Sequence, residues 1–506
     1  MRAGTLGVLY SVTVFVSSAM LLVLEIVAGR LLAPYVGVSL YTWTSIIGVI
    51  LAGLSLGNWL GGVLADRGWG HRAVGLFLVA SAGFSLAILP LLVLIGGPIQ
   101  SWEIDLLSAS FAYVLLLFFL PSVLLGVITP LVTTIYLKLD QRTGTIVGRM
   151  HALAAFGSIV GTFITGFVLV QWMGTRNIIV MVAFILFFLA LPFLFISRRS
   201  LSTVGLSLFA LSLTGAIGFF TNGLANPCTV ESNYYCLRVV EEKDANNRVN
   251  AHTMVIDHMV HSTNVIDDPA ALWTPYIEIM DALIHSHLAD PAQAKYFFAG
   301  GGAYTHPRSI AYRYPDAGIT VSEIDPAVTA LAEKSLFLNR TGMTIHHDDT
   351  RNILRYPGSE TFDVMITDVF HDVGIPYHLT TLEYATLIAD KLSKNGLYML
   401  NVIDVFPSNQ LIQSMVHTLK QVFPNVGVWI ENPPQDETRL TFVITAAYIP
   451  GNDQPTVIQT LSGRKWYEIR EFVEQQINEN GATLLTDNYA PVERLLRRLL
   501  TTSAGS

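Results

Sequence analysis

The sequence predicts a chain in two parts: a multi-span α-helical membrane domain, followed by an α/β domain with a doubly wound, Rossmann-like sheet that a small β-rich lid precedes. Of the 506 residues, 52% are hydrophobic and only 13% are charged, which leaves too little polar surface for a soluble protein of this size. Nearly all long hydrophobic runs precede residue 226, and strand and helix patterns alternate after residue 294. The predicted domains are 1–225 (membrane domain), 226–290 (β-rich lid and connecting helix) and 291–506 (Rossmann-like domain).

Seven segments are candidates for membrane spans, because a spanning helix needs about 20 mostly apolar residues. They are 6–28, 41–65, 73–96, 106–137, 151–172, 177–197 and 201–221. The fourth contains Pro121 and Pro130, so we expect a kink or a break there. A lipid bilayer is therefore an expected partner of the first part.

Basic residues in the short loops favour one orientation, since the side richer in Lys and Arg faces the cytoplasm. One side holds Arg2, Arg67, Arg72, Lys138, Arg142, Arg149, Arg198 and Arg199. The other side holds Arg30 and Arg176. With seven spans, everything after residue 221 would lie outside the cytoplasm, and a count that is wrong by one span would reverse this.

The two cysteines of the chain, Cys228 and Cys236, follow the last predicted span. Eight residues apart, they could pair across a hairpin or loop, which an oxidising compartment would allow. The alternative is two unrelated buried thiols. A disulfide would agree with the orientation that the loops favour.

Two classes of partner are not expected. The net charge of −8 and the absence of a stripe of Lys and Arg argue against nucleic acid. His346, His347 and Asp348 could suggest a metal site, but alternation along a strand points neighbours to opposite faces. No metal is therefore predicted.

Short apolar runs predict the strands of the α/β domain. They are "AKYFFAG", "GITVSEID", "MTIHHDD", "FDVMITD" and "GLYMLNV", with later strands near 425–430 and 440–447. Helical patterns separate them at 306–313, 326–338, 350–356 and 381–394. Pro326 lies in a first turn, where its missing N–H costs nothing. Upstream, β-forming residues over 234–265 predict the antiparallel lid and a helix follows over 270–288.

Glycines or carboxylates follow four successive strands of this domain. Ligands of such sheets bind outside the carboxyl ends of the strands, and these ends carry Gly300, Gly301, Gly302, Glu323, Asp325, Asp349 and Asp368. Glycines let a ligand approach the backbone closely. Glu323, about 20 residues further on, is placed to accept hydrogen bonds from ribose hydroxyls, and Asp349 to accept one from an adenine amino group.

No phosphate-binding motif accompanies these residues: GxxxxGK[ST] is absent, and "GGGAYTHP" is not GxGxxG. An adenosine without phosphates therefore fits better than NAD or ATP. S-adenosylmethionine and its relatives are adenosines of this kind.

The stretch from Glu231 to Asp404 resembles the spermidine synthase family of polyamine aminopropyltransferases. The resemblance rests on "ESNYYCLRVVE", "MVIDHMVHST", "TPYIEIM", "GGGAYTHPR", "VSEID", "HHDDTRNIL" and "FDVMITDVFHDVGIPYHLTTLEY". The whole chain is similar to a bacterial branch in which a multi-span segment precedes that domain. This implies a methyltransferase-type Rossmann-like fold, a multi-pass protein of the bacterial inner membrane, and a homodimer or larger oligomer.

The resemblance also implies a reaction: transfer of an aminopropyl group from decarboxylated S-adenosylmethionine to an amine acceptor, with release of methylthioadenosine. Asp368 matches the general base that takes the proton of the amine. Glu323 matches the ribose ligand, and Asp349, with Thr350 beside it, the adenine ligand. Pro376 matches the proline over the adenosine.

The acceptor half departs from the family's pattern, which makes putrescine a doubtful acceptor. Ala303 stands where the family usually has an Asp, His371 replaces a second Asp, Tyr235 replaces a Gln, and Ile277 replaces a His. Removing the charge partner of a desolvated cation costs several kcal/mol. The residues that could substitute are Tyr234, Tyr235, His261, Tyr276, Glu278, His371 and Asp372.

Two other functions remain open. A methyltransferase would use intact S-adenosylmethionine and need a partner for the methionine carboxylate, for which Arg308 is the nearby candidate. A transporter or sensor would bind adenosine or polyamine without turning it over. Glu25 within the first predicted span and Arg30 just after it suit this function. An S-adenosyl donor is made in the cytoplasm, so the predicted orientation stands against both enzymatic functions.

Overall fold

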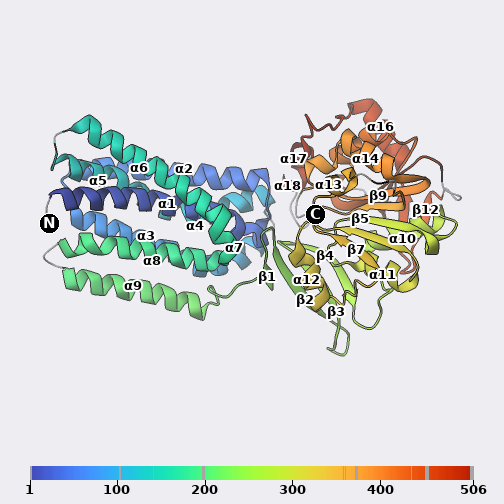
Figure 1. Cartoon of the computed structure of the whole chain (residues 1–506), viewed down its shortest axis with the longest axis horizontal. Coiled ribbons are helices and arrows are strands. Elements are labelled where there is room, and N and C mark those ends of the chain that lie inside the picture. The colour runs from blue at the N-terminus through green and yellow to red at the C-terminus, as the bar shows by residue number, and fades with distance from the viewer. Residues whose placement is uncertain are drawn as a thin grey trace. The chain divides into compact units, whose positions relative to one another are not determined.

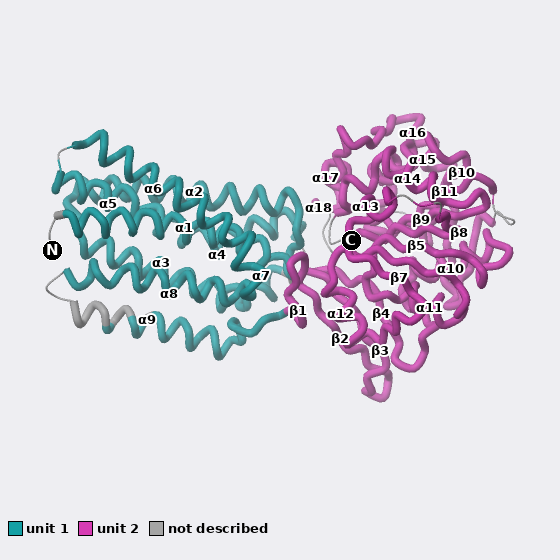
Figure 2. Tube along the Cα trace, viewed as in Figure 1, with its two compact units in different colours: residues 1–227 teal, residues 228–506 magenta. Residues whose placement is uncertain are grey.

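The computed structural model describes residues 3–101, 104–140, 142–196, 200–356, 358, 360–370, 374–434, 436–450 and 455–501. The chain forms two compact units, Met1–Pro227 and Cys228–Ser506 (Figure 2). Each unit has its own hydrophobic core.

The first unit is a bundle of long apolar helices (Figure 1). They are α1 (Ala3–Val36), α2 (Leu40–Asp66), α3 (His71–Ser101), α4 (Leu106–Gly126), α5 (Ile128–Leu137), α6 (Thr143–Ile164), the π-helix η1 (Thr165–Leu169), α7 (Val170–Trp172), α8 (Thr175–Ile196) and α9 (Ser200–Phe220). The break expected in the fourth span falls between α4 and α5, and Pro130 lies in the first turn of α5, where it needs no N–H partner.

Six of these helical segments, within the described residues, are long and apolar enough to cross a membrane. They correspond to the first six predicted spans, with α4 and α5 making one and α6 to α7 another. The seventh predicted span, 201–221, forms α9, of which the described apolar stretch is the shorter Leu211–Phe220. The structure thus gives six candidate spans where the sequence predicts seven.

Small residues let these helices approach closely. A Cβ at Gly57 of α2 would lie 2.2 Å from the carbonyl oxygen of Val123 in α4, and one at Gly157 of α6 would lie 2.2 Å from that of Phe15 in α1. Any larger residue at these positions would push the helices apart. Gly57, the first residue of "GNWLGGVLADR", thus lies where α2 and α4 approach closely.

The second unit begins with a four-stranded antiparallel sheet of order β1-β2-β3-β4. Its strands are β1 (Val230–Glu231), β2 (Cys236–Lys243), β3 (Val249–Ile256) and β4 (Met259–Val265), and α10 (Pro275–His287) follows. A disulfide joins Cys228 to Cys236 at the start of β2. Whether this sheet acts as a lid stays a prediction.

A nine-stranded mixed sheet forms the centre of the second unit, in the order β12-β13-β10-β11-β9-β8-β5-β6-β7 (Figure 1). The five strands β9 (Leu392–Phe406), β8 (Phe362–Thr367), β5 (Lys295–Ala299), β6 (Gly318–Ser322) and β7 (Met343–His346) are parallel. The other four are antiparallel: β10 (Asn425–Glu431), β11 (Thr438–Ala447), β12 (Val457–Gln459) and β13 (Lys465–Glu468).

Helices cover both faces of the sheet. They are η2 (Pro291–Gln293), α11 (Thr305–Arg313), α12 (Pro326–Ser335), α13 (Thr350–Arg355), η3 (Tyr377–Leu379), α14 (Leu382–Lys391), α15 (Gln410–Leu419), α16 (Arg470–Asn480), α17 (Val492–Leu495) and α18 (Arg497–Thr501). Successive side chains of β5 enter different cores: Phe297 packs in one, and Tyr296 and Phe298 in the other. A strand buried on both faces needs a continuous apolar run, which is the pattern that predicted it.

Chain order reverses at β5, because β6 and β7 lie on one side of it and β8 and β9 on the other. The carboxyl ends of β5 and β8 therefore meet at a topological switch point, where ligands of such sheets bind. Gly300 follows one of these ends and Asp368 the other.

Candidate active site

A glycine turn follows β5 and brings the backbone close to the end of β8. The φ angle is +95° at Gly300 and +51° at Gly302, which side chains other than glycine rarely adopt. A Cβ at Gly300 would also lie 2.2 Å from the carbonyl oxygen of Asp368. Glycine is therefore needed at position 300 by both backbone conformation and space.

Glu323, directly after β6, is held by two backbone amides. The Gly301 N–H donates to Glu323 Oε2 (2.8 Å) and the Asp325 N–H donates to Glu323 Oε1 (2.9 Å). Burial raises the pKa of this carboxyl to about 7, against the lowering effect of the hydrogen bonds from Asp325 and Gly301. The carboxylate thus ties the glycine turn to the end of the neighbouring strand.

Asp349 caps the first turn of α13 and pairs with a histidine from another loop. Its Oδ1 accepts a hydrogen bond from the Arg351 N–H (2.9 Å), and its Oδ2 lies 2.7 Å from His378 Nε2. The hydrogen bond from His378 lowers the pKa of Asp349. Beside it, the hydroxyl of buried Thr350 hydrogen-bonds that of Ser322 (2.9 Å), which joins α13 to the end of β6.

These residues line one cavity of about 120 Å³ at the switch point. The described lining residues include Tyr235, His261, Gly300, Gly302, Glu323, Asp349, Thr350, Asp368, Pro376 and His378. The predicted nucleotide residues other than Gly301 therefore converge on one cavity. The cavity offers backbone, carboxylate and apolar surface, and among the described lining residues it has no Lys or Arg for a phosphate.

Asp368, predicted as the general base, is oriented by two hydrogen bonds. The Tyr276 hydroxyl donates to Oδ2 (2.8 Å) and Asn401 Nδ2 donates to Oδ1 (2.9 Å). Burial raises the pKa of the carboxyl, and these two hydrogen bonds partly oppose that rise. Both oxygens keep acceptor capacity, so the carboxylate can receive a proton from a group in the cavity.

A second, smaller space of about 20 Å³ shares His261, Gly300, Gly302 and Asp368 with the larger cavity. His261 and Tyr276, both predicted substrate residues, line it together with apolar side chains such as Met280 and Phe298. Burial lowers the pKa of His261 to about 4, so this imidazole is neutral at physiological pH. Its Nε2 has no hydrogen-bond partner among the described residues, and Asp368 is the one carboxylate in the described lining.

Four other predicted acceptor residues lie elsewhere or outside the described residues. Glu278 does not reach the site, because its two oxygens accept hydrogen bonds from the Ser462 N–H and hydroxyl (both 2.6 Å). Tyr234 is half exposed and lines neither cavity, unlike its neighbour Tyr235. His371 and Asp372 lie outside the described residues.

Ala303, whose small side chain drew attention in the sequence, does not face the site. It is 0% exposed and packs in the core with Tyr304 and Ile310. Its carbonyl oxygen accepts a hydrogen bond from Asn264 Nδ2 (2.8 Å). A side chain at this position would meet protein rather than a ligand.

Sequence reasoning missed the pair His306–Asp281, which borders the smaller space. His306 lines it, and its Nε2 lies 3.4 Å from Asp281 Oδ1. Arg313 also donates to both oxygens of Asp281. Burial raises the pKa of Asp281, but hydrogen bonds from His306 and Arg313 outweigh this effect and hold the pKa well below its usual range. The second carboxylate of α10 is therefore also occupied by protein groups.

Asn401 and His378 were missed as well. Asn401 lies within the buried run of β9, where only its polarity among apolar neighbours could have signalled a role. His378 follows Pro376 in a loop, and nothing in the pattern links it to Asp349, 29 positions away. Among the described residues no group of three or more metal-ligating side chains occurs.

Fold and site define an α/β domain of the Rossmann type with a glycine turn and three carboxylates at its switch point. Residues 296–447 match the family described as "Spermine/spermidine synthase domain", and the C-terminal part of this chain contains a domain of that family.

The chain is similar to two curated proteins. It is 27% identical over 236 residues to a "Probable polyamine aminopropyl transferase" of Bifidobacterium longum, covering 42% of this chain and 51% of the relative. It is 26% identical over 155 residues to a "Polyamine aminopropyltransferase" of Vibrio vulnificus, covering 30% and 50%. The chain thus spans about half the length of these relatives.

Among solved structures, the chain is similar to a probable spermidine synthase from Corynebacterium glutamicum. The identity is 22% and the TM-score 0.45, over 52% of this chain and 97% of that one.

Proposed function

We propose that this protein is a membrane-tethered aminopropyltransferase that moves an aminopropyl group from decarboxylated S-adenosylmethionine to an amine. The observation that carries the proposal is that Asp368 lines both spaces at the switch point, with its two oxygens oriented by Tyr276 and Asn401. The family match over 296–447 supports the same reaction class.

In the proposed reaction, the lone pair of a neutral amine attacks the methylene next to the donor's sulfonium. A C–N bond forms and the C–S bond breaks, and the sulfur leaves as the neutral thioether of methylthioadenosine. The alkylated nitrogen carries one proton too many, and Asp368 accepts it. Holding the amine in line with the C–S bond, on the side of the methylene away from the sulfur, lowers the entropic part of the barrier.

The larger cavity suits the adenosine part of the donor. Glu323, held by two backbone amides, would bind the ribose hydroxyls, and Asp349, which lines the same cavity, would bind the adenine amino group. Pro376 and Leu379 supply apolar wall for the base. The site needs no partner for a phosphate, because the donor contains no phosphate group.

The proposed acceptor site differs from one built for a diamine. Glu278 is occupied by Ser462, and Asp281 by Arg313 and His306. No second carboxylate lines the smaller space within the described part of the chain. A buried ammonium without a partner costs several kcal/mol, so an acceptor with one amino group and an apolar or neutral remainder fits better.

Intact S-adenosylmethionine is less well suited, because its methionine carboxylate would need a cation. The sequence offered Arg308, but this side chain is buried, donates to the Val265 carbonyl oxygen (2.8 Å) and stands over the Phe337 ring. It lines neither space. A methyltransferase therefore gains no support from Arg308.

We also propose that the second unit lies outside the cytoplasm, which requires α9 to cross the membrane as a seventh span. The loop charges and the Cys228–Cys236 disulfide support this orientation. The donor would then have to reach that side of the membrane. Reporter fusions after residue 225, active only in the cytoplasm or only outside it, decide the side.

The reaction is tested with the purified full chain, decarboxylated S-adenosylmethionine and a panel of amines, by measuring methylthioadenosine release. Transfer is expected, with kcat/KM for butylamine within about threefold of that for 1,4-diaminobutane, whereas a carboxylate partner for the second ammonium would favour the diamine by about 100-fold or more. If none of the amines leads to release of methylthioadenosine, the proposed transferase activity is wrong. A strong preference for the diamine would contradict the acceptor assignment alone.

A further inference from the structure

A segment near the C-terminus, residues 484–491, reaches back to the loop that borders the larger cavity. The Leu382 N–H donates to the Leu485 carbonyl oxygen (2.8 Å), and the Asp487 N–H donates to Glu383 Oε2 (3.0 Å). These contacts fasten the segment to the first turn of α14. The segment therefore lies against an element that immediately follows the cavity-lining residues Pro376, His378 and Leu379.

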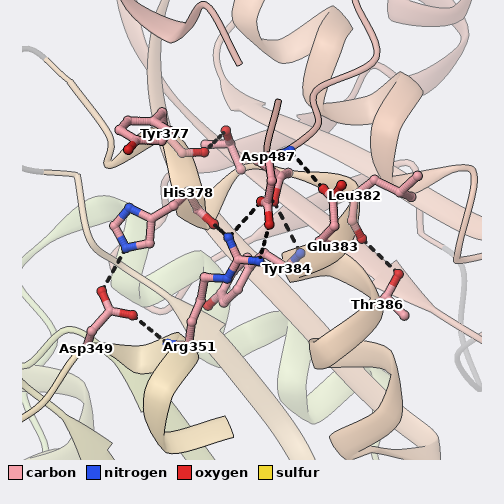
Figure 3. Close-up of polar contacts among 11 residues, drawn as sticks. Asp349, Arg351, Tyr377, His378, Leu382, Glu383, Tyr384, Thr386 and Asp487 are labelled. Carbon is pink, nitrogen blue, oxygen red and sulfur yellow. Dashed lines mark hydrogen bonds and ion pairs between the residues drawn. The ribbon is translucent and has the colours of Figure 1, made fainter. Parts of the chain in front are cut away.

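Asp487 in this segment forms a two-pronged ion pair with Arg351 of α13 (Figure 3). Arg351 Nη1 and Nη2 donate to the two carboxylate oxygens, each at 2.7 Å. The Thr381 hydroxyl donates to the same carboxylate (2.8 Å). Paired parallel hydrogen bonds of this kind fix geometry as well as charge, and the Arg351 side chain is only 8% exposed.

The guanidinium also holds the loop that carries His378. Arg351 Nη1 donates to the His378 carbonyl oxygen (3.1 Å), while the His378 ring contacts Asp349 Oδ2 on the cavity side (Figure 3). Arg351 and Asp487 themselves line neither described space. They can thus affect a ligand only through the residues that they hold.

We propose that Asp487 is a positioning residue for the adenine side of the donor site: by orienting Arg351, it fixes the His378 loop and, through His378, the carboxylate of Asp349. The inference rests on the proposed function, because it assumes that an adenosine occupies the larger cavity. It gives the segment around Asp487 a role in binding that its distance in sequence from the glycine turn conceals.

A purely structural ion pair would stabilise the fold without changing how the cavity binds, so binding and stability are measured separately. The first variant is Asp487→Asn, which keeps the shape and removes the charge. The matched control is Glu474→Gln, which removes the charge of the exposed Lys420–Glu474 pair on the same unit. Full chains are compared by calorimetry with methylthioadenosine, by melting temperature, and by the KM for the donor and kcat.

The Kd for methylthioadenosine and the KM for the donor are expected to rise about tenfold in Asp487→Asn, because mutations in a connected network shift a remote site by about this much. At saturating donor, kcat should stay within about twofold, and Glu474→Gln should leave Kd unchanged. Asp487→Glu, which restores the charge, should recover part of the affinity.

Arg351→Lys provides a second test if Asp487→Asn folds poorly, since lysine keeps the charge and loses the fork. It should raise Kd similarly, and the double variant should raise it no further. A lower melting temperature with unchanged Kd in both single variants would overturn the inference while leaving the transferase intact. A wild-type chain that does not bind methylthioadenosine would overturn the proposed function and this inference with it.

Discussion

The nucleotide half and the acceptor half of the candidate site both contain carboxylates, but the carboxylates have different partners. In the nucleotide half, Glu323 and Asp349 border a cavity and are held there by backbone amides and by His378. In the acceptor half, Glu278 and Asp281 are carboxylates too, yet each accepts hydrogen bonds from protein groups. A carboxylate serves a ligand only where the fold leaves part of it unpaired, so the count of acidic residues says little about which cation a site accepts.

The largest effect is expected where the two halves meet, at Asp368. Asp368→Asn should lower kcat by about 10³, because an amide cannot take the proton of the amine and a general base contributes about 10²–10⁴. Methylthioadenosine should still bind within about twofold, since asparagine keeps the shape of the side chain that lines the larger cavity. Single-turnover transfer and calorimetry on the full chain check the two quantities.

Glu360→Gln is the control for this variant, because Glu360 is exposed and pairs with Lys295 away from both cavities. A wild-type rate of transfer in Asp368→Asn would mean that Asp368 is not the general base. Loss of nucleotide binding would instead mean that Asp368 belongs to the nucleotide half.

The next largest effect concerns Ala303, where the family's pattern has an Asp. Because this side chain is 0% exposed in the core, Ala303→Asp should bury an unpaired carboxylate and destabilise the chain by about 3 kcal/mol or more. It should not create a preference for a diamine. Ala289→Asp, at an exposed position, is the control, and thermal melting with and without methylthioadenosine is the measurement.

A stable Ala303→Asp protein that prefers 1,4-diaminobutane would contradict the comparison directly. It would mean that this position faces the acceptor after all and that one substitution separates the chain from a diamine enzyme.

The smallest effect is a shift in pH dependence. Burial raises the pKa of Asp368, and the hydrogen bond from Tyr276 partly opposes that rise. Transfer needs the carboxylate, so the rate should increase as pH rises through this pKa. Tyr276→Phe removes a donor to the carboxylate, raises the pKa further and moves the acidic limb of the kcat profile to higher pH, by about one unit for a lost charge-assisted hydrogen bond. An acidic limb at the same pH in Tyr276→Phe and wild type would mean that Tyr276 does not affect the pKa of the general base.

Much of the fold followed from local pattern. The parallel strands β5, β8 and β9 coincide with apolar runs, because a strand buried on both faces has to be apolar. The turn after β5 was marked by its three glycines. The antiparallel edge made of β10 to β13 was foreseen only in part. The helices α15 and α16 were not foreseen, since polar residues such as Gln413 and Thr418 lie on the buried face of α15 and Val473 is the one buried residue of α16.

The nucleotide half was predictable for the same reason: its residues follow strand ends, and parallel strand ends converge. The acceptor half was not, because its character depends on contacts such as Glu278 with Ser462, 184 positions apart, and Ala303 with Asn264. Position in the sequence predicted which residues lie near β5, but it did not predict whether their side chains contact the cavities or other protein groups.

The central claim is that the larger cavity holds the adenosine of a decarboxylated donor. Its most direct test is calorimetry on the full chain with methylthioadenosine, decarboxylated S-adenosylmethionine and S-adenosylmethionine, with Asp349→Ala as the control. The account predicts that the first two bind at least about tenfold more tightly than the third, and that the variant loses both. Preference for intact S-adenosylmethionine, or binding of none of the three by the wild-type chain, would contradict it.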